Sequence, residues 1–407
     1  MMNQNKVLFI GLVWPEPTSS AAGKRILQLV DLFISQSFEV IFVSSATKNE
    51  MSADLESRGV RERKIELNDY EFNEFVRNMN PSIVVFDRFV SEEQFGWRVR
   101  QECPNTFQIL DTEDLHLLRS ARERAYKKNE TANPYNEISK REIASILRCD
   151  LSLMISEMEI ELLKNNFQIP SFLLFYLPFL EKIRTDYLLQ LKTFDERKDF
   201  VFIGNFLHEP NWQTVLYLNQ VAWPKIKKIL PNTNLHIYGA YPSPKVFGLG
   251  DVNKGFFVHG KADNALEVIR EARVMLAPLV FGAGQKGKFI DAMTAGTPIA
   301  TNSIGSESMF DSKIPGFVED DLDEFIQKSV ELYQNESLWK KAQLNGWEIL
   351  QEKFDKQLFE TTFFQRVNEI QSNLLQHRNQ NFIGQILKIN QFNALKYMSL
   401  WIEEKNK

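Results

Sequence analysis

Residues 275–309 read MLAPLVFGAGQKGKFIDAMTAGTPIATNSIGSESM, and this stretch decides how the rest of the chain is organised. Apolar and glycine-rich segments alternate in it in the order strand, loop, helix, strand. Strands are expected at 274–277 and 298–301, because both are short apolar runs of the kind that is buried in a sheet. Between them a helix is expected to open at 286–288 and to stop at Gly296. The pattern predicts a strand–helix–strand unit of a parallel sheet.

The loop of this unit carries almost no side chains, and lysines follow it where the helix begins. Free backbone N–H groups and the positive end of a helix dipole attract anions at such a place, and lysine adds a point charge suited to phosphate. We predict that a nucleoside diphosphate lies on this loop and that an acidic residue one helical turn further on accepts hydrogen bonds from ribose hydroxyls. An ordinary strand-to-helix crossover with a solvated lysine pair is the alternative. The predicted donor-binding residues here are Gly282, Ala283, Gly284, Gln285, Lys286, Gly287, Lys288 and Asp291.

The run FGAGQKGKFIDAMTAGTPIAT, residues 281–301, resembles the donor-binding segment of the retaining nucleotide-sugar glycosyltransferases of family 4, which have the GT-B fold. The shared features are a glycine-rich loop, an acidic residue followed by Ala-Met, and then x-Gly-x-Pro. This chain has the Gly-Ala-Gly-x-Lys-Gly-Lys form of the loop. The resemblance implies an α/β protein with two Rossmann-like, doubly wound domains facing a central cleft, followed by a helical C-terminal extension.

Composition limits the broad class of the protein. A length of 407 residues predicts about two domains, and a formal net charge of −5 argues against a nucleic-acid binder. Neither Cys103 and Cys149 nor the five histidines have the spacing of metal ligands or of a disulfide framework. We therefore expect no metal and no cofactor apart from the donor as co-substrate. No export signal is visible and no apolar run reaches the ~20 residues that span a bilayer, so we expect a soluble cytoplasmic protein, with peripheral association at the inner face of the cell membrane left open.

Short apolar runs alternate with segments of helix length through both halves of the chain. This alternation predicts parallel sheets covered on both faces, which bind ligands outside the carboxyl ends of their strands. We expect an acceptor-side domain at 1–185, a donor domain at 199–355 and C-terminal helices at 356–407. The hinge is expected within 180–198, where charges dominate, and the resemblance implies that the first of the C-terminal helices returns to the N-terminal domain. In the first half, strands are expected at 7–10, 40–43, 83–86, 107–110 and 151–155.

Three features of the first half follow predicted strands. The loop at 15–25 resembles a glycine-rich loop of the family, although only Gly23 is glycine, and a surface loop with a serine cap is the alternative. A charge pair at 87–88 is left unassigned. The third feature, LDTEDLHLLRSARER at 110–124, brings several titratable groups to one strand end.

The stretch at 110–124 resembles an Asp-Thr-x-Asp-x-His segment of a subset of the same glycosyltransferases. That resemblance places Asp114 and His116 near the donor sugar, and we predict them, with Lys286, as catalytic residues. A capping or surface histidine is the alternative for His116. The helix that follows carries a basic face, which either meets an anionic acceptor or lipid headgroups or is a solvated face. This face consists of Arg119, Arg122, Arg124, Lys127 and Lys128.

The segment FIGNFLHEPN at 202–211 also resembles the family, in which a Gly-Arg and a nearby lysine often grip the diphosphate. Here Asn205 stands in the place of the arginine and Pro210 in that of the lysine, and Ala283 replaces the first acid of the family's acidic pair. Lys286, Lys288 and backbone N–H groups are then expected to balance the diphosphate charge. We predict further donor contacts from Gly204, Asn205 and His208, main-chain contacts to the base near His259 and Gly260, and weaker contacts from Ser303 and Ser306.

The segment at 382–401 has an apolar stripe at helical spacing, with Phe392 and Leu395 among its members. Packing on its own domain, docking on a membrane surface and a dimer contact are the three interpretations of this stripe.

Together these features predict a retaining glycosyltransferase of the hexosyltransferase type. It would move a sugar from a nucleoside-diphosphate sugar to a glycan or lipid-linked acceptor in the synthesis of cell-surface polysaccharide or lipopolysaccharide. On this interpretation Lys286 and the loop amides stabilise the charge of the leaving diphosphate. The alternatives are a nucleotide-sugar epimerase, which needs a pair of acids at the sugar ring, and a non-catalytic GT-B subunit of a glycan-assembly complex.

Overall fold

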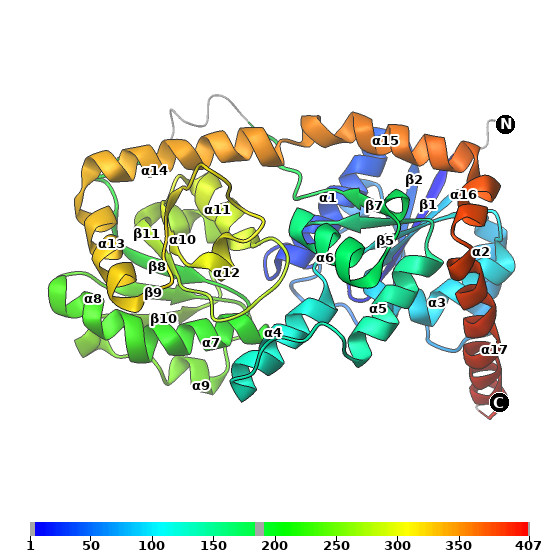
Figure 1. Ribbon diagram of the computed structural model, residues 1–407, viewed down its shortest axis with the longest axis horizontal. Helices are drawn as coiled ribbons and strands as arrows, with labels where there is room; N and C mark the ends of the chain where they lie inside the picture. Colours follow the sequence, from blue (N-terminus) through cyan, green and yellow to red (C-terminus); the bar gives the residue numbers. More distant parts are fainter. Residues whose placement is uncertain (1–4, 184–190, 406–407) are drawn as a thin grey trace.

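The computed structural model describes residues 5–183 and 191–405, with the side chains of 391–395 left out. Two α/β domains lie side by side along the long axis of the molecule (Figure 1). Each domain is built on one sheet, with seven strands in the first and six in the second. Every pair of neighbouring strands is parallel. The predicted fold class of two doubly wound parallel-sheet domains with a helical C-terminal region is confirmed.

The N-terminal sheet has the strand order β3-β2-β1-β4-β5-β6-β7. Its central strands are fully buried, which explains why they read as continuous apolar runs in the sequence. The strands are β1 (Lys6–Gly11), β2 (Glu39–Ser44), β3 (Arg61–Lys64), β4 (Ile83–Asp87), β5 (Phe107–Asp111), β6 (Leu151–Met154) and β7 (Leu174–Tyr176). The helices are α1 (Ala21–Ser35), η1 (Glu56–Arg58), α2 (Tyr70–Met79), α3 (Arg88–Glu102), α4 (His116–Lys128), α5 (Glu137–Arg148), α6 (Glu157–Phe167) and η2 (Ser171–Leu173).

The second sheet has the order β10-β9-β8-β11-β12-β13. In both sheets the chain adds strands outwards to one side of the first strand and then continues on its other side, so the strand order reverses between the first and the fourth strand of each domain. Ligands of doubly wound sheets bind at this switch point, outside the carboxyl ends of the strands. The strands are β8 (Lys198–Ile203), β9 (Leu235–Tyr238), β10 (Phe256–Gly260), β11 (Ala272–Ala277), β12 (Ile299–Thr301) and β13 (Gly316–Val318). The helical elements are α7 (Glu209–Tyr217), the π-helical turn η4 (Leu218–Ala222), α8 (Trp223–Ile229), α9 (Pro244–Phe247), η5 (Val252–Lys254), α10 (Ala265–Glu271), α11 (Gly287–Ala295), α12 (Ser303–Ser306) and α13 (Leu322–Gln334).

The C-terminal helices cross from the second domain to the first. Helix α14 (Glu336–Ile349) covers the second domain, and a π-helical turn, η6 (Leu350–Phe354), leads into α15 (Lys356–Ser372) along the first domain (Figure 1). Phe363 and Phe364 of α15 pack edge-on against Phe33 of α1, with ring centroids 5.9 and 5.5 Å away. The chain then continues through α16 (Leu374–Gln380) and α17 (Phe382–Lys405). Within the described ranges no helix is both long enough and apolar enough to cross a membrane.

Differences from the expected elements have local physical causes. Strand β3 reads RERK and was not expected, because it is an edge strand without buried side chains. Strand β13 has only three residues and begins at Gly316, so it gives no periodic signal. The helical segment from α7 to α8 is divided by the π-helical turn η4, and Pro224, which has no N–H, stands at the start of α8. Part of the expected hinge, 184–190, lies outside the described residues.

Candidate active site

The start of α11 faces the N-terminal domain across a narrow interface. Gly287, its first residue, lies so close to the first residue of α1 that a Cβ added there would be 2.5 Å from the Cβ of Ala21. Gly284 has φ +61°, and a Cβ on it would be 2.6 Å from the Cβ of Asp114. Glycine is required at both places, at Gly287 for close approach and at Gly284 also for the left-handed backbone. The predicted donor loop therefore meets the predicted catalytic strand end directly.

Lys286 is buried at this interface, and Lys288 is partly buried in the first turn of α11. The Nζ of Lys286 donates to the carbonyl oxygen of Gly284 at 2.6 Å, and burial lowers the pKa of Lys286 to about 8. The Nζ of Lys288 donates to Oδ1 of Asn211 at 2.5 Å and lies 4.3 Å from the centre of the Phe202 ring. Burial, with the charge of Lys286 as a second cause, lowers the pKa of Lys288 to about 7. Two ammonium groups held in a low-dielectric environment bind an anion more strongly than exposed lysines do.

The other residues of the donor loop make contacts within the protein. The N–H of Gly284 donates to Oε1 of Glu159 at 2.9 Å. Gln285 accepts a hydrogen bond from the N–H of Phe179 at 3.2 Å and lies 3.4 Å from the hydroxyl of Tyr176. Asp291 lies one turn into α11, but its Oδ1 pairs with the Nζ of Lys24 at 3.2 Å. Lys288 and Asp291 therefore face different partners, and Lys24 competes with a ribose for Oδ1 of Asp291.

The acidic strand end at 111–116 forms a cluster in the N-terminal domain. Both carboxylate oxygens of Asp114 accept hydrogen bonds from Arg119, at 2.6 and 2.5 Å. Burial alone would raise the pKa of Asp114, but Arg119 and neighbouring groups lower it to about 2. His116 Nε2 lies 3.7 Å from Asp114 and has no hydrogen-bond partner among the residues that the structure describes, and burial lowers the pKa of His116 to about 4. The histidine is therefore neutral at pH 7 and offers a polar atom to a ligand.

Two further residues of this cluster have strained backbones. Glu113 has φ +58° and Arg88 has φ +67°, and their side chains pair at 3.2 Å. Burial raises the pKa of Glu113 to about 8, and within the described part of the chain its Oε1 has no hydrogen-bond partner. Left-handed backbone at residues other than glycine concentrates at functional sites. The pair at 87–88, which sequence reasoning left unassigned, thus belongs to the candidate site.

Arg122 is a site residue that the sequence analysis placed only on a basic helix face. It reaches from α4 to the second domain, where it donates to the carbonyl oxygen of Gly282 at 2.7 Å and to both oxygens of Glu307, at 2.8 and 2.7 Å. The solvated-face alternative is thus wrong for Arg119 and Arg122, whereas Arg124, Lys127 and Lys128 are exposed. Helical spacing does not indicate this division, because at 100° per residue Lys127 lies within about 20° of residue 116 around α4.

The strand end after β8 supplies the remaining predicted contacts. A Cβ on Gly204 would be 2.6 Å from Cγ of Asn211, and the carbonyl oxygen of Asn205 accepts a hydrogen bond from Asn211 Nδ2 at 2.9 Å. Asn211, which was not predicted, thereby holds Lys288 against this strand end. Burial lowers the pKa of His208 to about 4, and Arg119 is the charge with the largest further effect. His208 therefore lies in the field of the N-terminal cluster as well as of the two lysines.

The weaker predictions lie further from this cluster. Ser303 donates to Asp320 at 2.9 Å, and Ser306 donates to the carbonyl oxygen of Ser303 at 3.1 Å, so both hydroxyls serve local turns. His259 is exposed and stacks on Tyr238 with centroids 4.5 Å apart. Among the described residues no group of three or more histidine, cysteine, aspartate or glutamate side chains is arranged to hold a metal ion.

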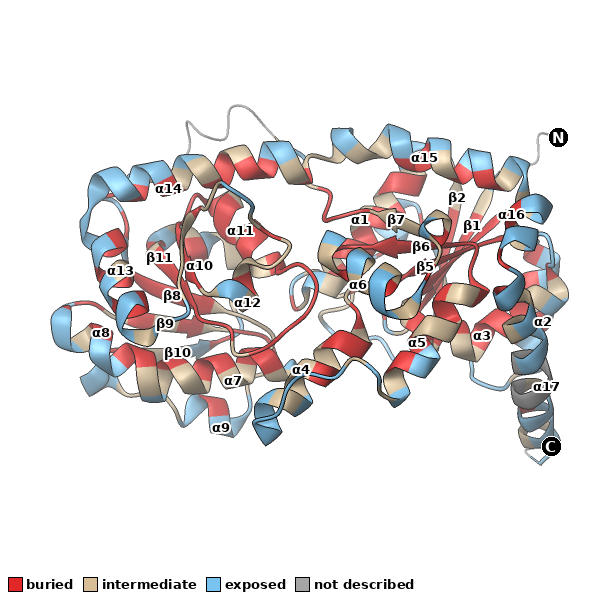
Figure 2. Ribbon diagram, in the orientation of Figure 1, coloured by how far each residue is buried: buried red, intermediate tan, exposed pale blue. Residues whose placement is uncertain are grey.

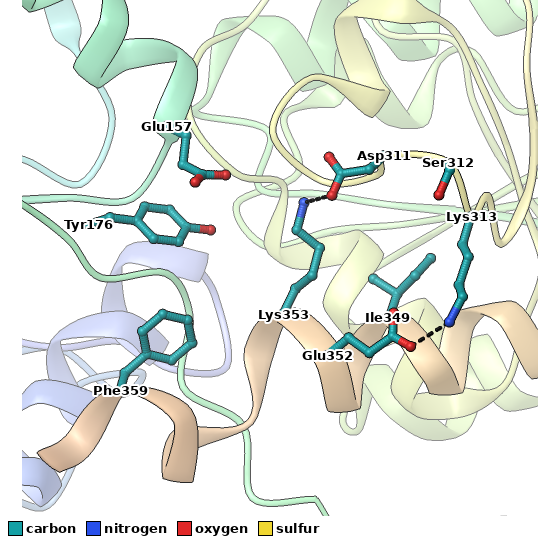
Figure 3. A pocket seen from close by; sticks show the side chains of 9 residues that line it. All are labelled: Glu157, Tyr176, Asp311, Ser312, Lys313, Ile349, Glu352, Lys353 and Phe359. Carbon is teal, nitrogen blue, oxygen red and sulfur yellow. Dashed lines mark hydrogen bonds and ion pairs between the residues drawn. The ribbon is translucent and has the colours of Figure 1, made fainter. Parts of the chain in front are cut away.

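A cavity of about 360 Å³ lies behind the donor loop, where α14 gives way to α15 (Figure 3). Its wall includes Tyr176, whose hydroxyl is the neighbour of Gln285. Two ion pairs lie among its lining residues, one between Lys353 and Asp311 at 2.8 Å and one between Lys313 and Glu352. None of the predicted site residues lines this cavity, so we place the candidate site at the lysine-bearing interface and not here.

Comparison with known proteins agrees with the fold. Residues 197–335 match the family model described as Glycosyl transferases group 1, and this segment spans the second domain through α13. An uncharacterized 44.6 kDa protein in the cps region of Klebsiella pneumoniae is 28% identical over 173 residues. That match covers 40% of this chain and 44% of the relative, so the chain matches less than half of that protein's length.

Solved structures resemble nearly the whole chain. TarM has a TM-score of 0.70 at 10% sequence identity, and the match covers 90% of this chain and 99% of that chain. A complex of a Staphylococcus aureus TarM mutant with fondaparinux, α-GlcNAc-glycerol and UDP has a TM-score of 0.57 at 13% sequence identity, and the match covers 74% of this chain and 58% of that chain. WaaG, a glycosyltransferase involved in lipopolysaccharide biosynthesis, has a TM-score of 0.60 at 12% sequence identity, and the match covers 88% of this chain and 98% of that chain. These likenesses establish that the fold is GT-B.

Proposed function

We propose that the protein is a retaining glycosyltransferase that moves a hexose from a nucleoside-diphosphate sugar to a glycan or lipid-linked acceptor in the synthesis of cell-surface polysaccharide or lipopolysaccharide. The observation that carries this proposal is the position of Lys286 and Lys288. Lys286 is buried and Lys288 is partly buried at the N-terminal end of α11, and His208 beside them lies in the field of Asp114 and Arg119 from the other domain. The match of residues 197–335 to glycosyl transferases supports the same conclusion.

The proposed mechanism is electrostatic. Lys286, Lys288 and the first N–H groups of α11 bind the diphosphate and stabilise the negative charge that grows on it as the sugar leaves. Each such donor contributes a few kcal/mol in a site from which water is excluded. Asp291 would accept hydrogen bonds from the ribose hydroxyls after it exchanges Lys24 for the ligand. His116, neutral and with an unsatisfied Nε2, would accept a hydrogen bond from a sugar hydroxyl.

The state of Asp114 supports the retaining stereochemistry. Both of its oxygens are bonded to Arg119, and its pKa of about 2 makes it a poor base and a poor nucleophile. With Asp114 unavailable as base or nucleophile, the acceptor hydroxyl would attack on the face from which the diphosphate leaves, and the diphosphate would take up its proton. Asp114 would instead orient the sugar and keep the Arg119 charge beside the donor.

Release of nucleoside diphosphate tests this proposal. Wild-type protein is incubated with a panel of nucleoside-diphosphate sugars, with and without glycan or lipid-linked acceptors. We expect acceptor-dependent release, and a fall in turnover of at least a hundredfold in Lys286→Ala. Lys245→Ala, which changes an exposed lysine of α9, is the control and should leave turnover unchanged. Release of the nucleotide without acceptor together with sugar isomerisation would support the epimerase, and no turnover of any donor would support a non-catalytic subunit.

A further inference from the structure

Helix α17 turns its most apolar face towards solvent. Met398 is exposed on another side of it, and seven large side chains are exposed on one side, from 40% at Leu400 to 68% at Phe382. At 100° per residue they fall within an arc of about 120° of the helix circumference. Figures 1 and 2 show that α17 runs along the edge of the N-terminal domain and ends beyond it. The arc consists of Phe382, Ile383, Ile386, Ile389, Tyr397, Leu400 and Trp401.

The opposite face of α17 is fixed to the protein, so the helix cannot roll its apolar arc inwards. Arg98 of α3 donates to the hydroxyl of Ser399 at 2.7 Å and pairs with Glu403 at 2.5 Å. Near the other end, Asn381 donates to the carbonyl oxygen of Leu147 at 2.7 Å, and Lys388 turns towards Asp150. Contacts at both ends set the rotation of the helix. The exposed arc is therefore a consequence of the fold and not of a loose terminus.

We propose that this arc binds the same arc of a second copy of the chain, with the two α17 helices antiparallel. Charge favours this occupant over an anionic bilayer. A helix that lies on such a bilayer needs a cationic border. Here the exposed basic side chains of the neighbouring helices are neutralised by acids, as in the pairs Arg141–Glu93 at 2.5 Å and Arg77–Glu102 at 2.7 Å. The formal net charge of the chain is −5.

The arc is also complementary to itself in an antiparallel pair. Phe382 of one copy would lie opposite Trp401 of the other, and Ile386 would lie opposite Tyr397. Each of these two pairs would thus bring a large aromatic ring against another apolar side chain. The helix dipoles would oppose each other, and the acidic C-terminal turn with Glu404 would lie near the other helix's N-terminus. Aromatic side chains bury ~150–250 Å² each. The three in the arc are each about two-thirds exposed, so together with its aliphatic side chains they would bury several hundred Å² per partner, a large part of the ~800 Å² of a standard interface.

Sedimentation velocity of the full chain across a wide range of concentration tests this proposal. We expect a dimer that becomes monomeric in the double variant Ile386→Glu, Ile389→Glu, with an unchanged circular dichroism spectrum. Ile229→Glu is the matched control, because Ile229 is 44% exposed on α8 of the other domain, against 42% for Ile386. That variant should remain dimeric. A wild-type chain that is monomeric at every concentration, or a double variant that is still dimeric, would overturn the proposal.

Two further measurements address orientation and the competing occupant. Cys103 and Cys149 are buried, so introduced cysteines can be oxidised selectively. The double variant Ile386→Cys, Tyr397→Cys should form a covalent dimer under mild oxidation, whereas Ile386→Cys alone should not. Self-linkage of Ile386→Cys would show parallel helices and contradict the arrangement. Flotation of the wild-type chain with anionic phospholipid vesicles, lost in the Ile386→Glu, Ile389→Glu variant, would identify a lipid surface as the occupant instead.

Discussion

At the scale of single residues, the three charged groups expected to hold the diphosphate and the ribose already have partners inside the protein. Lys286 donates to Gly284, Lys288 to Asn211, and Asp291 pairs with Lys24. Binding of the diphosphate and the ribose therefore replaces these internal contacts with contacts to the ligand. The exchange is favourable for the lysines, because an amide or carbonyl oxygen is a weaker partner for a buried ammonium group than a phosphate is.

The lowered pKa values of these lysines predict how donor binding depends on pH. Lys286 and Lys288, with pKa values of about 8 and 7, lose their charge as the pH rises through those values. A diphosphate favours the charged form, so we expect its affinity to fall by about tenfold per pH unit and per lysine above pH 8. Calorimetric titration between pH 7 and pH 9.5 measures this. Lys288→Met should make the affinity fall less steeply with pH. An affinity for the diphosphate that does not depend on pH would contradict the proposal that these two lysines bind it.

The same lysines affect stability in the opposite direction. Their folded pKa values lie below the unfolded value of about 10.4, so the unfolded chain binds more protons between those limits. The cost of charging them in the folded state is fully present at low pH and is relieved as the pH rises from about 7 towards 10.4. A site that binds anions best at neutral pH is thus maintained at the expense of stability.

At the scale of elements, the site depends on two helix N-termini that almost touch, those of α1 and α11. We expect Gly287→Ala to force them apart, because its Cβ would be 2.5 Å from that of Ala21, and overpacking of this kind costs about 1–3 kcal/mol. Donor affinity should fall by at least tenfold, as measured by titration. Adding Ala21→Gly should restore it. Gly248→Ala is the control, since a Cβ there would meet nothing closer than 3.4 Å. Full affinity in Gly287→Ala would show that the close approach is unnecessary.

The elements themselves were largely predictable, because buried parallel strands are short apolar runs bounded by turn residues. The central strands β1, β4 and β5 follow this rule, and so does the unit from β11 to β12. The edge strand β3 does not, since all its residues are polar and none is buried. The sequence also predicted the apolar stripe of α17, but not whether it would face the protein or solvent. That orientation is set by contacts such as Arg98 with Glu403, which are distant in sequence.

At the scale of the whole molecule, the candidate site is completed only where the two sheets present their strand ends to each other. Arg122 of the first domain holds Gly282 and Glu307 of the second, and Glu159 accepts from Gly284. Local spacing identified the lysines and the acidic strand end separately. It could not identify Arg122, Asn211 or Lys24, because each acts through a partner that lies far away in sequence and is brought near by the domain arrangement.

The central claim is that a nucleoside diphosphate binds at the lysine-bearing interface between the domains. Calorimetric titration of the wild type and of Lys286→Ala with UDP, GDP, ADP and CMP at neutral pH tests it most directly. We predict that one nucleoside diphosphate binds the wild type with a stoichiometry of one per chain and that Lys286→Ala weakens this binding by at least tenfold. Equal affinity in both proteins, or no binding of any of these nucleotides to the wild type, would contradict the account.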